Sequence, residues 1–162
     1  MKLIFLIFSL VLLSIAHVGA GELKHLTLDD ASAIGLRIQT DSNTRIEGEG
    51  SIKITTLWPA TVCLGQVTGL DVENSMLIYR AQVKSELKGT AFLEMWAHIA
   101  GGQYFSKGMN NPIKGKSSWQ TLQTPFMFQK GQQPDKVTLN LVVNGTGTVW
   151  VDDITLLKEA LK

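Results

Sequence analysis

Alternation of apolar and polar residues in short runs is the feature that most constrains the fold of this chain. Apolar side chains occupy every second position in five runs: 34–38, 52–54, 79–83, 91–99 and 137–143. Side chains of a β-strand point alternately to its two faces, so each run predicts a strand with one face on a core. Helical periodicity is scarce, because only 28–33 and 156–161 could hold a turn or two of helix.

Turn-forming residues separate these runs. They cluster at 41–43, 48–50, 88–89, 101–102, 108–112, 131–134 and 144–145. Asn144-Gly145 is the sharpest of these signals, because both residues tolerate positive φ and strand-like patterns flank them. We therefore predict a tight hairpin turn at Asn144-Gly145. Many short strands without intervening helices predict one all-β domain, either a sandwich or a barrel.

The N-terminus has the parts of a secretory signal peptide. A basic start at Lys2 is followed by an apolar run, Leu3 to Ile15, and then by small residues that end at Ala20. This run has about 13 residues, whereas a membrane-spanning helix needs about 18 or more. We predict a signal peptide over 1–20, a single β-sandwich domain over 21–162, and export to the periplasm or the extracellular space. No later segment is apolar enough to span a membrane after cleavage.

Charge and cysteine content exclude several functions. Removing Lys2 leaves a net charge of about zero, and no basic block is present, so nucleic acid and anionic membranes are poor partners. The chain has one cysteine, Cys63, which excludes an intramolecular disulfide. Because Cys63 lies in an apolar stretch, we predict that it is a small buried hydrophobic residue. No histidine lies near it in sequence to act as the base of a thiol enzyme.

A distinctive strand motif lies near the C-terminal end of the sequence, at 150–154. In Trp150-Val151-Asp152-Asp153-Ile154, an aromatic residue precedes two aspartates and an aliphatic residue, and a glycine-containing turn precedes the motif. This ending, with weaker matches at 50–54, 77–83, 89–96 and 119–122, resembles carbohydrate-binding modules of the galactose-binding-like jelly-roll type. The resemblance covers roughly 45–157 in patches. It implies an all-β, jelly-roll-like antiparallel β-sandwich in which Trp119 and Trp150 are packing residues.

A candidate ligand site follows from the register of two strands. Leu93, Met95 and Ala97 occupy one face of their strand, so Glu94, Trp96 and His98 share the other face. Arg80 and Gln82 share one face of the preceding strand in the same way. If these two strands are neighbours, an aromatic and polar patch of the type that binds sugars results. The alternative is an ordinary solvated face on which a loop partly covers Trp96.

Two further features bear on binding. Tyr104 and Phe105 follow a glycine turn, where aromatic side chains could either bind a ligand or tuck the loop onto the core. The resemblance also implies a structural calcium ion held by Asp153 together with oxygens near the first strand. The sequence does not identify these oxygens, and Glu22, Asp29 and Asp30 are candidates by position alone. His25 and His98 have no neighbouring residues at ligand spacing, so the sequence gives no sign of zinc or of any other cofactor.

No catalytic centre is evident. Adjacent residues of a strand point to opposite faces, so Asp152 and Asp153 do not form a natural pair of catalytic carboxyls, and Glu94 has no identifiable partner. The sequence therefore predicts an exported, non-catalytic binding domain whose partner is a glycan or polysaccharide. The alternative is an envelope or extracellular domain that contacts another exported protein or is structural, without a sugar site.

Overall fold

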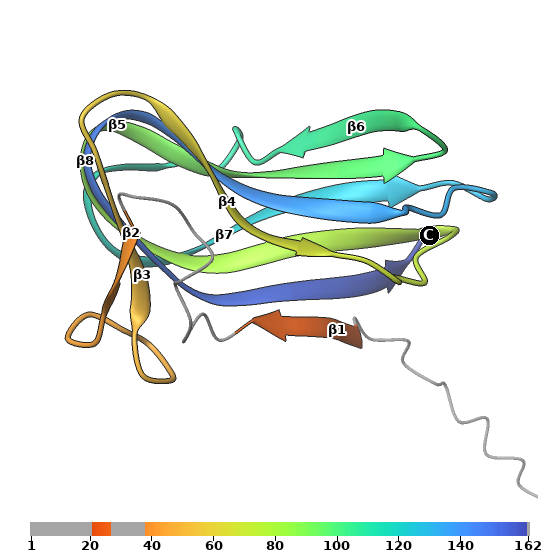
Figure 1. Ribbon diagram of the computed structural model, residues 1–162, viewed down its shortest axis with the longest axis horizontal. Coiled ribbons are helices and arrows are strands. Elements are labelled where there is room, and N and C mark those ends of the chain that lie inside the picture. Colours follow the sequence, from red (N-terminus) through yellow and green to blue (C-terminus); the bar gives the residue numbers. More distant parts are fainter. Residues whose placement is uncertain (1–20, 27–37, 162) are drawn as a thin grey trace, which may run out of the picture.

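The computed structural model describes residues 21–26 and 38–161, and all of its described elements are antiparallel strands (Figure 1). They are β1 (Gly21–Leu26), β2 (Ile38–Asp41), β3 (Ser51–Thr56), β4 (Ala60–Val67), β5 (Ser75–Ile99), β6 (Gly102–Lys107), β7 (Ile113–Phe128) and β8 (Lys136–Ala160). The predicted all-β, jelly-roll-like sandwich is confirmed. The predicted signal peptide and most of the 34–38 run lie outside the described residues.

Two long strands organise both layers of the sandwich. β5 and β8 pair along their whole length, from Ser75 with Ala160 to His98 with Lys136. Figure 1 shows the two strands bending together at one end, so that each contributes to both layers. In one layer the order is β4, the start of β8, the end of β5 and β6. In the other it is β1, the end of β8, the start of β5 and β7. The short β2–β3 pair joins β8 at the bend.

The prediction of a hairpin turn at Asn144-Gly145 is wrong. Gly145 lies inside β8 and faces Gly89 of β5, which also lies within a strand and not in the predicted turn. Both glycines have positive φ, 151° and 139°. A Cβ on either one would overlap the backbone of the opposite strand. Glycine is needed here because the paired strands bend sharply and their backbones approach closely.

The C-terminal tail is also strand and not helix. β8 continues to Ala160, because its last part pairs with β1 on one side and with β5 on the other. Backbone partners on both sides outweigh the weak helical pattern of 156–161.

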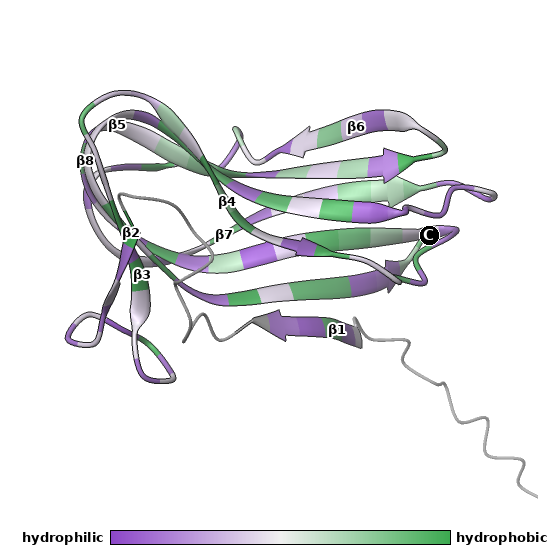
Figure 2. Ribbon diagram, in the orientation of Figure 1, coloured by the Kyte–Doolittle hydropathy of each residue, from purple (hydrophilic) through white to green (hydrophobic). Residues whose placement is uncertain are grey.

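The core lies between the two layers, where the alternating apolar residues meet. Leu93, Met95, Leu139, Leu141 and Val151 are fully buried in one cluster, as their alternation predicts. Figure 2 shows the corresponding change between hydrophobic and hydrophilic residues along the strands.

Cys63 is an exception to the expected burial. It is exposed, so the prediction of a buried cysteine is wrong. It pairs with Asn140, which lies on the outward face of β8, and β4 is bulged between Cys63 and Gly65. Its register therefore points the thiol away from the core, despite apolar neighbours in sequence.

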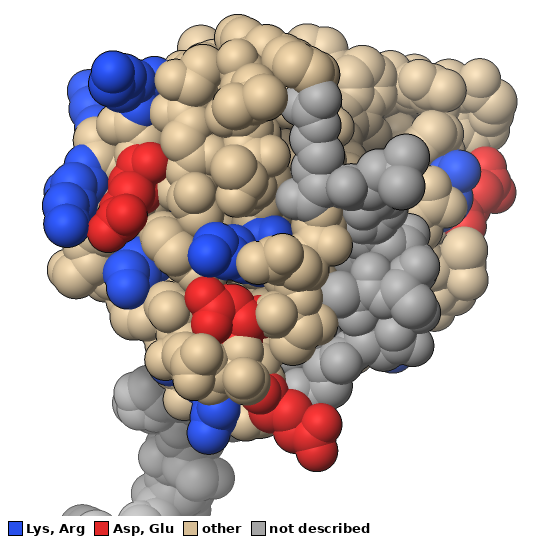
Figure 3. Space-filling view, turned by 60° about the vertical axis from the view of Figure 1, so that its left-hand side comes forward, with Lys and Arg blue, Asp and Glu red and all other residues tan. Residues whose placement is uncertain are grey.

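The surface carries charges of both signs. Figure 3 shows Lys and Arg side chains close to Asp and Glu side chains on the face that contains the bend. No helix long and apolar enough to cross a membrane is found among the described residues.

Candidate functional site

Glu94 is the centre of a polar cluster on the outward face of the layer that contains β6. Its side chain is buried, with 7% of its surface exposed. Oε1 accepts hydrogen bonds from Trp96 Nε1 at 2.7 Å and from Asn140 Nδ2 at 3.2 Å, and Oε2 lies 3.1 Å from Lys107 Nζ. The register explains the arrangement, because Glu94 lies directly opposite both Lys107 of β6 and Asn140 of β8.

These donors keep Glu94 charged. Burial alone would raise the pKa of Glu94, but the hydrogen bonds from Trp96, Lys107 and Asn140 and the charge of Lys107 together lower it below its ordinary value. A carboxylate with donors on both oxygens and a lowered pKa is a structural hydrogen-bond acceptor. It fixes the orientation of the Trp96 indole, which becomes a rigid part of this face.

Aromatic side chains extend the cluster toward solvent. The rings of Trp96 and Phe105 lie 5.2 Å apart between centroids, and Phe105 is 56% exposed. Lys107 Nζ lies 4.9 Å from the centre of the Phe105 ring. His98, two residues beyond Trp96, lies 3.5 Å from Thr138 Oγ1 through its Nε2. The surface thus combines a partly exposed indole, an exposed phenyl ring and several polar groups, which is the composition that a sugar site needs. We call it the Glu94 face.

The structure does not bring all of the predicted ligand residues together. Glu94, Trp96 and His98 share the Glu94 face, as predicted. Arg80 and Gln82 belong to the other half of the same strand, opposite Thr155 and Asp152 of β8. The odd-numbered residues of both halves enter one core, so the even-numbered residues point away from it on opposite sides of the sandwich. The predicted patch that combines Arg80 and Gln82 with Trp96 therefore does not form, because its condition of two neighbouring strands is not met.

The two aromatic residues that follow the glycine turn lie within β6, and their side chains point in two directions. Phe105 lies opposite Trp96 and shares its face, whereas Tyr104 lies opposite the buried Ala97 and leaves β6 on the core side. Tyr104 is nevertheless half exposed, because β6 is the outermost strand of its layer. Phe105, for which the sequence left ligand binding and packing onto the core both open, is thus a neighbour of Trp96 on the outward face. The glycine turn alone does not indicate which way Phe105 points, because that depends on the register of β6 with β5.

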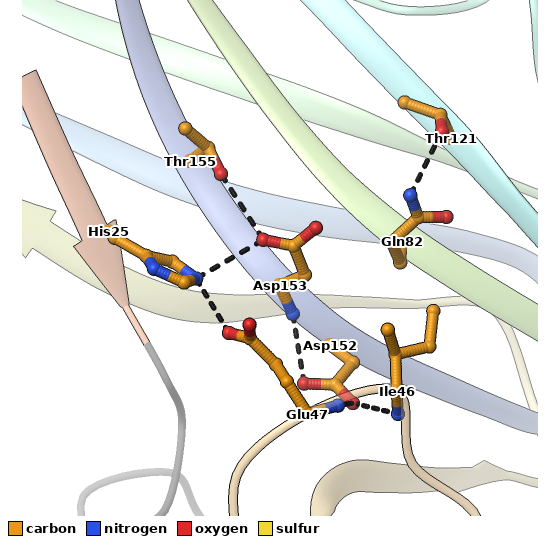
Figure 4. A network of polar contacts seen from close by, with 8 residues as sticks. All are labelled: His25, Ile46, Glu47, Gln82, Thr121, Asp152, Asp153 and Thr155. Carbon is orange, nitrogen blue, oxygen red and sulfur yellow. Dashed lines mark hydrogen bonds and ion pairs between the residues drawn. The ribbon is translucent and has the colours of Figure 1, made fainter. Parts of the chain in front are cut away.

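A second polar cluster lies on the opposite layer, around Asp153 (Figure 4). It consists of His25, Glu47 and Asp153, and we call it the His25 cluster. His25 Nε2 of β1 is 2.6 Å from Glu47 Oε1 and 3.1 Å from Asp153 Oδ1. The buried Asp152 carboxylate holds this region together. It accepts hydrogen bonds from the backbone N–H groups of Ile46 and Glu47, at 2.6 and 3.3 Å, and from that of Asp153 at 2.9 Å.

Asp153, the residue predicted to hold a metal, is therefore grouped with two residues that the sequence did not indicate as its partners. His25 and Glu47 lie far from it in the chain and show no ligand spacing. Of the partners suggested by position, Glu22 is not part of the group, and Asp29 and Asp30 lie outside the described residues. Calcium takes about 6–8 oxygen ligands, and a donor set with an imidazole nitrogen at its centre suits it poorly. The calcium ion stays a prediction.

Comparison with known proteins identifies the fold. No family model matches the sequence, and no curated protein matches it. Among solved structures, the CBM22-1 xylan-binding domain of Paenibacillus barcinonensis Xyn10C aligns with a TM-score of 0.64 and 13% identity, over 91% of this chain and all of that domain. The chain has the fold of the β-sandwich carbohydrate-binding modules.

Two other structures show the range of proteins that share this fold. The CBM22-1 and GH10 modules of Clostridium thermocellum Xyn10B, complexed with xylohexaose, align with a TM-score of 0.60 and 14% identity, over 87% of this chain and 29% of that one. A cyclase from Fischerella sp. TAU aligns with a TM-score of 0.57 and 13% identity, over 76% and 73% of the two chains. At these identities the likeness shows the fold, which hosts more than one function.

Proposed function

We propose that this protein is a non-catalytic carbohydrate-binding domain that binds a glycan or polysaccharide on the Glu94 face. The observation that carries the proposal is the pairing of a fixed indole, Trp96, with the exposed ring of Phe105 on a face lined by polar side chains. Sugar rings stack their C–H faces on such aromatic surfaces, while their hydroxyl groups bond to the polar groups around them.

The fold supports the same proposal. Similar structures include xylan-binding domains and a module complex with xylohexaose, so a β-1,4-linked polysaccharide such as xylan is a rational first ligand to test. Trp96 and Asn140 lie on neighbouring strands, β5 and β8, and present their side chains on the same outward face.

The chemistry of the carboxylates supports a non-catalytic role. A glycosidase acid needs a raised pKa and access to the glycosidic oxygen. Glu94 has a lowered pKa, and both of its oxygens contact protein donors. Asp152 is fully buried and accepts three backbone N–H groups. Both carboxylates therefore act as structural acceptors.

Export is part of the proposal and rests on the N-terminal sequence. A basic start, a short apolar run and small residues before Gly21 support secretion to the periplasm or beyond. N-terminal sequencing of the exported protein should find Gly21 as its first residue.

A second function is supported by a different observation. Leu57 and Trp58, in the turn between β3 and β4, are 70% and 53% exposed. Exposed apolar residues at a loop tip favour a contact with another protein. In that case the domain would serve as an extracellular or envelope interaction module, and the Glu94 face would bind no sugar.

The test compares two exposed apolar residues on opposite sides of the molecule. Phe105→Ala removes the ring beside Trp96, and Met127→Ala removes a side chain of similar exposure, 59%, that lies on the other layer opposite Met76. Binding of the purified protein to a polysaccharide panel that includes xylan is measured by pull-down and by calorimetry. We expect Phe105→Ala to weaken binding at least about tenfold, because stacking residues dominate such interfaces.

The control defines the outcome that contradicts the proposal. Met127→Ala should bind within about twofold of the wild type, and both variants should unfold within about 1 kcal/mol of it, as at most surface sites. Trp96→Ala should also lose binding, although it additionally removes a donor to Glu94. If no polysaccharide binds, or if Phe105→Ala binds as well as the wild type, the sugar site is not on this face.

A further inference from the structure

The cluster around His25 brings three metal-ligating groups together from separate parts of the chain. His25 comes from β1, Glu47 from the loop before β3, and Asp153 from β8, and their ligand atoms all lie within 4.8 Å of one another (Figure 4). The three side chains are 33%, 35% and 29% exposed, so an ion from solvent can reach them.

Two of the three groups are held in place by the backbone. The buried Asp152 carboxylate accepts the N–H groups of both Glu47 and Asp153, which fixes the points from which these side chains project. Asp153 has a φ of 48°, a left-handed conformation that is uncommon outside glycine and that often marks functional positions. Thr155 Oγ1 lies 3.4 Å from Asp153 Oδ1 and further orients that carboxylate.

The polar contacts within the cluster are incomplete. Glu47 Oε1 is buried and has no hydrogen-bond partner in proper geometry, although His25 Nε2 lies only 2.6 Å away. An imidazole Nε2 carries at most one proton and can donate it along one direction. It therefore cannot satisfy both Glu47 Oε1 and Asp153 Oδ1, at 2.6 and 3.1 Å, whereas a cation between the three atoms would satisfy all of them.

We propose that His25, Glu47 and Asp153 form a binding site for a divalent ion of the zinc class. Imidazole with carboxylates is a donor set for Zn²⁺, Co²⁺ or Ni²⁺, whereas Ca²⁺ prefers oxygens alone. Three protein ligands leave a fourth, tetrahedral position for water. Zinc–ligand bonds of about 2.0–2.2 Å in a tetrahedral site place two ligand atoms about 3.4 Å apart. The distances from His25 Nε2 to Glu47 Oε1 and to Asp153 Oδ1 must therefore lengthen by less than about 1 Å when the ion binds. Partly exposed side chains allow this by small rotations.

Such an ion would act as a structural link. It would join β1 and the 42–50 loop to β8, next to the place where the long strands bend. The competing interpretation is that the His25 side chain donates to one carboxylate and attracts the other only by its charge, with no metal present. The site does not depend on sugar binding, because the Glu94 face lies on the other layer.

The experiment measures metal binding by untagged, chelator-stripped protein in a Cys63→Ser background, which removes the exposed thiol as a competing ligand. Calorimetry with Zn²⁺ should show one ion per chain, with a Kd at least about tenfold lower than for Ca²⁺. At a Zn²⁺ concentration about one hundred times the Kd, the Tm should rise by about 5 °C or more. Bound Co²⁺ should show the intense visible absorption of a four-coordinate ion.

Variants assign the site. His25→Gln and Asp153→Asn should each weaken Zn²⁺ binding at least about tenfold and abolish the Co²⁺ absorption. His98→Gln, which changes a histidine on the opposite face, should bind Zn²⁺ as the parent does. The proposal is overturned if Zn²⁺ binding does not saturate, if His25→Gln and Asp153→Asn retain parental affinity, or if Ca²⁺ binds more tightly than Zn²⁺.

Discussion

The Glu94 face and the His25 cluster are both built around a carboxylate, but the chain assembles them in different ways. Every partner of Glu94 comes from a regular register position on β5, β6 or β8. The His25 cluster combines one residue of an outer strand, one loop residue and one residue in left-handed backbone. A periodic sheet thus arranges the first cluster, whereas the second depends on a loop anchored by the buried Asp152.

The two regions also differ in burial, and therefore in how much their polar contacts contribute to the free energy of unfolding. The Glu94 side chain is 7% exposed, whereas the His25 side chain is 33% exposed. Water screens the contacts of His25 and can replace them, but it cannot reach the donors of Glu94 as easily. We therefore expect substitutions to cost less stability at the second cluster than at the first.

The largest effect should come from the core that both regions share. Leu139 lies beneath the Glu94 face and Leu156 beneath the layer that carries the His25 cluster, and both are fully buried. Leu139→Ala and Leu156→Ala should each destabilise the protein by about 2–5 kcal/mol, because a buried cavity remains. Denaturant unfolding measures the loss. A loss below about 0.5 kcal/mol at either position would mean that the inward register of β8 is wrong in that layer.

An intermediate effect is expected at Glu94. Glu94→Gln keeps the shape but removes the charge that Lys107, Trp96 and Asn140 stabilise, and should cost about 1–3 kcal/mol at pH 7. Because the folded-state pKa of Glu94 is lowered, its stabilisation is complete above the unfolded pKa of about 4.3 and is lost as the pH falls through the folded pKa.

The pH dependence of that difference is the measurement. In urea unfolding, the stabilities of the wild type and of Glu94→Gln should differ at pH 7 and converge as the pH falls below the folded-state pKa of Glu94. A separation that stays constant over this range would show that the cost of Glu94→Gln comes from packing and not from the charge.

The smallest effect is expected at His25. Without added metal, His25→Ala should change the free energy of unfolding by less than about 1 kcal/mol, since it removes only partly exposed ion pairs. Thermal unfolding of chelator-treated protein tests this. If His25→Ala lowers the free energy of unfolding as much as Glu94→Gln does, the two regions do not differ in this way, and the contacts of His25 stabilise the fold as strongly as those of Glu94.

Alternation predicted more of the Glu94 face than of the His25 cluster. It placed Glu94, Trp96 and His98 on one face, because period two holds along a regular strand. It could not place Phe105 or Lys107, since their contact with that face depends on how β6 pairs with β5. It joined Arg80 and Gln82 to the same patch because two separate strands were expected where one strand, β5, bends between layers.

The sequence by itself determined the fold class and the inward and outward residues of its regularly alternating runs, such as 79–83, 91–99 and 137–143, because these depend on local alternation that any antiparallel sheet must satisfy. Tertiary structure decided what a local pattern cannot encode. In the sequence, Gly89 and Gly145 are typical turn residues. In the structure they face each other within two paired strands, where they allow the strands to bend and approach closely. His25, Glu47 and Asp153 are separated by tens of residues, and only strand pairing and the Asp152 anchor bring their ligand atoms together.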